Sequence, residues 1–92
     1  MSQCMRINLL IKGDKEHIQA LLRKYAHEFK LEGILKSADE HAVKVVACGD
    51  AMEIESFMVE LNKEFAKDNL NISEVEPFLK DRDYRGVFRV IE

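Results

Sequence analysis

The sequence predicts an α+β sandwich in which an antiparallel sheet carries two helices on one face. Three observations support this fold class: an alternating strand near the start, two stretches with helical periodicity, and the order β-α-β-β-α-β along the chain, with allowance for one extra short strand. The 92 residues are expected to form one domain, 1–92, because no repeat, linker or low-complexity segment divides them.

The first two elements are a strand and an amphipathic helix. Alternate residues from Met5 to Ile11 are apolar, which is typical of a strand with one buried face. Gly13 interrupts this strand, and Asp14 is placed to cap the helix that follows. Helical spacing puts one apolar stripe on that helix, formed by Ile18, Leu21, Leu22, Tyr25, Ala26 and Phe29.

The rest of the chain supplies the remaining strands and the second helix. Short apolar segments predict strands over 31–37 and 42–49, and the second of these is rich in valine. A second amphipathic helix begins at Asp50, with a stripe formed by Ile54, Phe57, Met58, Leu61 and Phe65. A weaker strand over 72–78 contains Pro77, which favours an edge or a strand end, and a final strand spans 87–92.

This element order is that of a ferredoxin-like sandwich, which predicts where the loops meet. The first strand is expected to be central, flanked by the third and the last, with the second strand at an edge and parallel to the first. Loop 12–17 and turn 37–41 should then lie at one end of the sheet. Cys4 and Cys48 should lie at the other end, and without an export signal we expect free thiols and a cytoplasmic protein.

Composition argues against several functional classes. The net charge of −3 and the pI of about 5.6 disfavour binding to nucleic acid or to an anionic membrane. No segment approaches the ~20 apolar residues of a membrane span. The central strands carry no aromatic residues on which RNA bases could stack. His17, His41 and Asp39 lack a metal-ligand spacing, so no metal is expected.

Loop 12–17 has the outline of an anion site, because a helix start offers unpaired N–H groups. Asp14 and Glu16 would repel an anion there, so an ordinary capped helix is the favoured interpretation. Arg23 is expected to face solvent, and His27 to be a packing or surface residue. The candidate anion-binding residues are Lys12, Gly13, Lys15, His17 and Ile18.

Several segments together resemble the acylphosphatase family. They are "AHEFKLEGILKS" at 26–37, "DEHAVKVVACGD" at 39–50, the spacing I-x-x-F-x-x-x-L from Ile54, and the terminal "VFRVI". The resemblance extends over roughly residues 5–91 and implies a single acylphosphatase-like domain. The positions in register are mostly structural ones: Ala26, Leu31, Gly33, Asp39, Val43, Gly49, Phe57 and Leu61.

The resemblance also implies where catalytic groups would lie. Members of the family hydrolyse carboxyl-phosphate bonds without a cofactor, using a glycine-rich loop that ends in arginine and an asparagine at the end of the second strand. Counted from Ala26, the arginine position falls on Gln19 and the asparagine position on Ser37, while "KGDKEH" replaces the loop. A neutral amide cannot replace a guanidinium as a phosphate clamp.

Two functions are therefore considered. The favoured one is a monomeric, non-catalytic domain that binds a protein or small-molecule partner; exposed Leu10, Val46, and Phe78 or Phe88 would mark its surface. The alternative is an acylphosphatase with an altered anion site, in which Lys12, Lys15 or His17 replaces the arginine.

Overall fold

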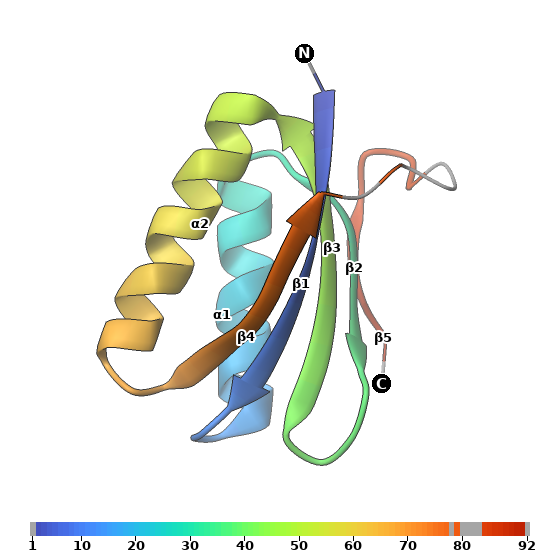
Figure 1. Ribbon diagram of the computed structural model, residues 1–92. Helices are drawn as coiled ribbons and strands as arrows, with labels where there is room; N and C mark the ends of the chain where they lie inside the picture. Colours follow the sequence, from blue (N-terminus) through green and yellow to red (C-terminus); the bar gives the residue numbers. More distant parts are fainter. Residues whose placement is uncertain (1, 78, 80–83, 92) are drawn as a thin grey trace.

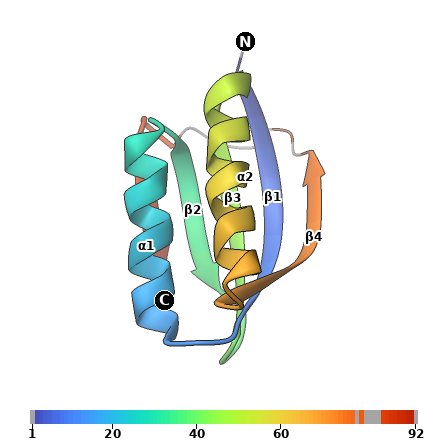
Figure 2. The same cartoon turned by 90° about the vertical axis from the view of Figure 1, so that its left-hand side faces the viewer.

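The structure, a computed structural model, describes residues 2–77, 79 and 84–91. Both helices lie on one face of a five-stranded sheet (Figure 1), which confirms the predicted ferredoxin-like sandwich. Viewed from the helix side, α1 lies over β5 and beside β2, and α2 lies over β1 and β3 (Figure 2). The elements are β1 (Ser2–Ile11), α1 (Lys15–Glu28), β2 (Glu32–Ser37), β3 (Ala42–Asp50), α2 (Ala51–Ala66), β4 (Leu70–Pro77) and β5 (Phe88–Ile91).

The strand order β4-β1-β3-β2-β5 corrects two predictions. The strand beside β1 on its outer side is β4 and not the C-terminal strand. The second strand, β2, is not at an edge, because β5 pairs with it in parallel and makes the sheet mixed. The physical reason lies in β5 itself: Phe88 and Val90 lie on the same face of the strand, and Phe88 is only 2% exposed on the helix-covered side of the sheet.

Each helix ends with a residue in the left-handed region that is not glycine. Lys30 has φ 56° after α1, and the Leu31 N–H donates to the Ala26 carbonyl at 2.8 Å. After α2, Asp68 has φ 62°, and the Asn69 N–H donates to the carbonyl of Glu64 at 3.1 Å. These bonds satisfy carbonyls at the helix ends and turn the chain into β2 and β4.

The core fills the space between the sheet and the helices, and one buried carboxylate lies among its apolar side chains. Glu64 of α2 is 3% exposed and accepts hydrogen bonds from Tyr25 Oη at 3.2 Å and Asn69 Nδ2 at 2.6 Å. Burial raises the pKa of Tyr25, and the neighbouring Glu64 carboxylate raises it further. This network joins α1, α2 and the start of β4. None of the described helices could cross a membrane.

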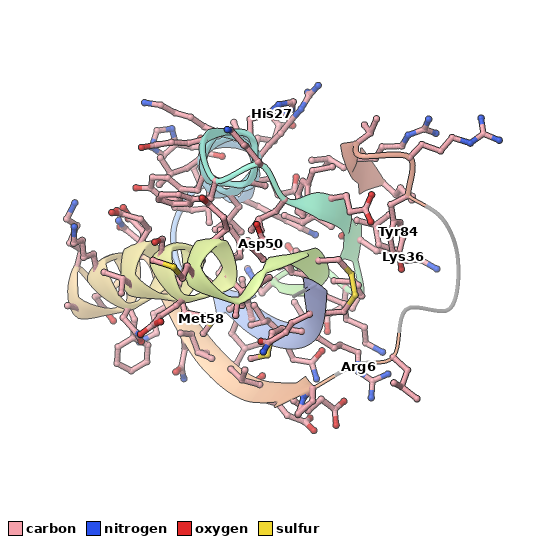
Figure 3. The ribbon with its side chains drawn as sticks, turned by 90° about the horizontal axis from the view of Figure 1, so that it is seen from above. Arg6, His27, Lys36, Asp50, Met58 and Tyr84 are labelled. Atoms are coloured by element: carbon pink, nitrogen blue, oxygen red, sulfur yellow. A yellow bond between two sulfur atoms is a disulfide. The ribbon has the colours of Figure 1, made fainter. Side chains whose placement is uncertain are left out.

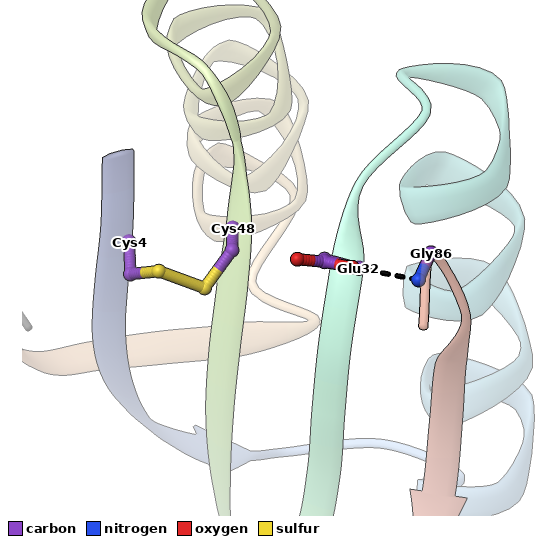
Figure 4. The surroundings of a disulfide bond; sticks show 4 residues. All are labelled: Cys4, Glu32, Cys48 and Gly86. Carbon is purple, nitrogen blue, oxygen red and sulfur yellow. Dashed lines mark hydrogen bonds between the residues drawn. A yellow bond between two sulfur atoms is a disulfide. The ribbon is translucent and has the colours of Figure 1, made fainter. Parts of the chain in front are cut away.

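The prediction of free thiols is wrong, because Cys4 and Cys48 form a disulfide (Figure 4). The two residues are directly opposite each other in the antiparallel register of β1 and β3, although 44 positions separate them in sequence. That register follows from the alternation of both strands, and it brings the two side chains together on the face without helices.

Part of this second sheet face is covered by the segment that precedes β5. Tyr84 lies on the side of the sheet opposite the helices (Figure 3) and packs with Val46 and Cys48 in a small buried cluster. Val46 is therefore only 8% exposed. The prediction that Val46 and Phe88 mark an exposed surface is wrong, because both side chains are buried. Leu10 is exposed as predicted. Phe78 lies outside the described residues.

The disulfide should stabilise the fold by restricting the unfolded chain. We expect reduction, or the double change Cys4→Ala and Cys48→Ala, to lower the free energy of unfolding by about 2–4 kcal/mol. Urea unfolding with and without dithiothreitol measures this difference. The double variant is the control, since the reductant should leave its curve unchanged; identical curves for the oxidised and reduced native chain would contradict the expectation.

Gly33 should be the glycine least tolerant of substitution, because β2 and β3 approach each other closely there. Its φ is 146°, and an added Cβ would lie 1.8 Å from the Val46 carbonyl oxygen. We expect Gly33→Ala to cost about 3 kcal/mol or more in urea unfolding. Gly13→Ala is the matched control, since a Cβ there meets nothing within 4 Å. Equal stabilities of the two variants would refute this reading of the strand contact.

Candidate functional site at the start of helix α1

Loop 12–17 and turn 37–41 meet at the end of the sheet where α1 begins, as predicted; we call these two segments the α1 rim. The Ile11 N–H donates to the His41 carbonyl at 2.8 Å. Lys15 reaches across from α1, and its Nζ donates to the Asp39 carbonyl at 2.6 Å and to Ser37 Oγ. The rim is therefore held together by one helix and the turn between β2 and β3.

The N-terminus of α1 is capped by its own aspartate. Asp14 Oδ1 accepts from the backbone N–H of Glu16 at 3.1 Å and more weakly from that of His17 at 3.4 Å. The Ile18 N–H donates to the Asp14 carbonyl at 3.0 Å, and the Ile18 side chain is buried in the core. A carboxylate thus occupies the position at the helix start that suits an anion.

The cations of the rim are directed to oxygen atoms of the protein. Lys12 Nζ lies 2.7 Å from a carboxylate oxygen of Asp68, beyond the end of α2. Lys15 is bound to Ser37 and Asp39, as described above. His17 is exposed, and its ring makes no hydrogen bond within the described part of the chain. Gly13 is in open space, so no close backbone approach requires glycine there.

Asp39 organises the turn between β2 and β3. Its Oδ1 accepts from the backbone N–H groups of His41 at 2.9 Å and Ala42 at 2.8 Å. These bonds hold the pKa of the Asp39 carboxyl below its usual value, and the charges of His41 and Lys15 add to the effect. The turn therefore presents an ionised carboxylate at neutral pH.

The two family-equivalent catalytic positions lie in different surroundings. Gln19 is in the second turn of α1, four residues after the helix begins, and only 5% of it is exposed. Its Nε2 is buried and has no hydrogen-bond partner among the described residues. Ser37 ends β2. Its Oγ accepts a hydrogen bond from Lys15 Nζ, so this hydroxyl, and not an asparagine amide, stands at the position. No described group of three or more His, Cys, Asp and Glu side chains is placed to hold a metal ion.

The sequence analysis did not predict a groove that lies between α1 and β5, along the face of α1 that carries Gln19, Arg23 and His27. Its volume is about 1070 Å³. Arg23 is exposed as predicted, and His27 lies on the side of α1 away from α2 (Figure 3). The spacing of Gln19, Arg23 and His27, four residues apart, could have indicated a shared polar face. The groove is lined by Glu16, Gln19, Ala20, Arg23, Lys24, His27 and Val90.

The fold is that of a ferredoxin-like sandwich in which the first helix begins beside the turn between β2 and β3. The model of the acylphosphatase family matches residues 19–90, which is more than half of the sequence. The chain belongs to the acylphosphatase family. The matched segment begins at Gln19 and leaves loop 12–17 outside. No curated protein matches the sequence.

Solved structures with the same fold include enzymes of this family and part of a larger protein. An acylphosphatase from Coxiella burnetii is 25% identical with a TM-score of 0.72, over 97% of this chain and 92% of that one. An acylphosphatase from Bacillus subtilis is 19% identical with a TM-score of 0.66, over 100% and 99%. T. kodakarensis HypF is 18% identical with a TM-score of 0.74, over 98% of this chain but 12% of its own.

The lowered pKa of Asp39 makes stability depend on pH. The pKa of the Asp39 carboxyl is lower in the folded chain than in the unfolded chain, where it is about 4. The ionised carboxylate therefore stabilises the fold at pH values above about 4. This stabilisation is lost as the pH falls through the pKa of the folded chain. We expect Asp39→Asn to reduce stability at pH 7 and the deficit to shrink below about pH 4. Urea unfolding at a series of pH values tests this. Glu40→Gln is the control for removal of a neighbouring charge, and a pH-independent deficit in Asp39→Asn would contradict the assignment.

Proposed function

We propose that this domain does not hydrolyse acyl phosphates by its family's mechanism and acts instead as a binding domain. The observation that carries the proposal is the Asp14 cap. A phosphate held at a helix start needs the first free N–H groups, and Asp14 Oδ1 accepts from those of Glu16 and His17. An incoming phosphate would have to displace a carboxylate and approach its negative charge.

The position of the family's arginine supports the same conclusion. Hydrolysis of an acyl phosphate needs positive charge where the phosphoryl oxygens lie, and loss of a single preorganised donor typically costs a factor of about 10²–10³ in rate. Gln19 carries no charge and is buried within the second turn of α1. Ser37, at the asparagine position, offers a hydroxyl that is engaged by Lys15.

A second candidate function is an altered acylphosphatase that uses Lys15 as its cation. The observation in its favour is specific: the Lys15 ammonium lies at the rim, in contact with Ser37 Oγ and 2.6 Å from the Asp39 carbonyl oxygen. Lys12 is less suited to this role because Asp68 neutralises it.

The other features of the favoured function are part of the proposal. A protein or small-molecule partner, a monomeric state and a cytoplasmic location are proposed with the binding role. The acidic balance of the chain, with a net charge of −3, supports a partner other than nucleic acid or an anionic membrane.

Turnover of an acyl phosphate distinguishes the two candidate functions. With benzoyl phosphate as substrate, we expect no hydrolysis above the uncatalysed rate, even at high concentrations of the chain. Turnover that disappears in Lys15→Met and persists in Lys12→Met would overturn the proposal and establish the altered enzyme. Turnover lost only in His17→Ala would overturn it as well and assign the cation to His17.

A further inference from the structure

The groove between α1 and β5 is lined both by Gln19, whose side-chain amide nitrogen is buried without a hydrogen-bond partner among the described residues, and by the cations Arg23 and Lys24. Gln19 belongs to the lining of this groove, and its Nε2 has no hydrogen-bond partner among the described residues although the residue is 95% buried. Buried polar groups in proteins are nearly always hydrogen-bonded to protein, water or ligand. The amide nitrogen is therefore a donor that lacks an acceptor.

Two cations, Arg23 and Lys24, lie about one turn further along the same helix, and His27 lies two turns further along. Arg23 and His27 follow Gln19 at intervals of four residues and so share its face of α1, and Lys24 borders the same groove. Neither Arg23 nor Lys24 has an acidic partner within 4.0 Å among the described residues. In a chain with a net charge of −3, Arg23 and Lys24 form an exposed positive patch that makes no ion pair with the described residues.

The shape and the remaining lining define the size and polarity of a ligand. A volume of about 1070 Å³ is slightly above the range for small-molecule sites, roughly 300–1,000 Å³, so a small ligand would fill only part of this open groove. Ala20 and Val90 give the groove an apolar part beside the polar residues. Glu16 lies nearer the N-terminal end of α1, so the positive end of the groove is at Arg23 and Lys24, with His27 beside them.

We propose that this groove binds a small organic anion with a carboxylate or phosphate group. Arg23 and Lys24 pair with the acidic group, with His27 beside them. Gln19 Nε2 is enclosed in the unliganded structure, so its side chain must turn outward to donate to another oxygen of the ligand. The ligand's apolar part lies against Ala20 and Val90. Charge-assisted bonds from a guanidinium suit carboxylate and phosphate oxygens equally well in geometry, so the two groups are tested side by side.

This site deepens the proposed binding role and rests on it, but the two can fail separately. The anion would lie on the outer side of α1, away from the helix start capped by Asp14. Turnover of benzoyl phosphate would overturn the proposed loss of catalysis, but it would not contradict anion binding in the groove. Absence of binding in the groove would overturn this site and leave the turnover result as it stands.

The test is an NMR titration of the full, disulfide-bonded chain labelled with ¹⁵N. The probes are phenyl phosphate and benzoate, with benzyl alcohol as the uncharged control. We expect saturable shifts of the Gln19 side-chain amide and of the backbone amides of 19–27 and Val90 with at least one anion and none with the alcohol. The tighter of the two anions identifies the acidic group that the site prefers.

Variants separate a built site from general attraction to a positive surface. We expect the double change Arg23→Gln and Lys24→Gln to weaken binding about tenfold or more, and Gln19→Met, which keeps the side-chain length, to weaken it severalfold. Urea unfolding should show that Gln19→Met remains folded, since it removes an unpaired buried amide. Lys44→Gln, which removes an exposed charge on β3, is the matched control and should bind as the native chain does.

Three results would overturn the proposal. The first is the absence of saturable shifts with both anions. The second is a set of shifts confined to residues 12–18, which would place the anion at the helix start. The third is equal binding by the native chain and the Arg23→Gln, Lys24→Gln variant, which would show that the cations of the groove do not hold the acidic group.

Discussion

The pairing of β1 with β3 determines where every other part of this molecule lies. The two strands run antiparallel at the centre of the sheet, in a continuous register from Ser2 opposite Asp50 to Leu10 opposite Ala42. Because side chains alternate across a strand, this register assigns one set to the core under the helices and the other to the open face. It also sets the opposite directions in which the chain leaves for α1 and α2.

The same register explains both ends of the sheet. At one end it places Cys4 against Cys48, where Tyr84 and Val46 complete a second buried cluster. At the other end it brings the start of α1 to the turn that follows β2. The opposing ends therefore differ in chemistry: one is covalently linked and apolar, and the other is polar, with its helix start capped by Asp14.

The sequence predicted elements that depend on local pattern and missed those that depend on distant partners. Alternation identified β1, helical periodicity identified α1 and α2, and Asp14 was recognised as a cap. The parallel pairing of β5 with β2 was missed, since four residues carry too little pattern to indicate a partner more than fifty positions away. The disulfide was missed because thiol chemistry was inferred from a presumed compartment, although the cysteines were correctly placed on adjacent strands. The groove was missed because Arg23 and His27 were considered singly rather than as a face.

Only one of the pairings between described strands joins neighbours along the chain, the β2–β3 hairpin. The pairings β1–β3, β1–β4 and β2–β5 each close a long loop, and the entropy of closing it is lost before any contact compensates. An isolated hairpin is marginal in water. Assembly of this sheet is consequently cooperative, because the distant strands and the helices must pack at the same stage of folding. Most contacts join residues far apart in sequence, and such a high contact order favours slow folding.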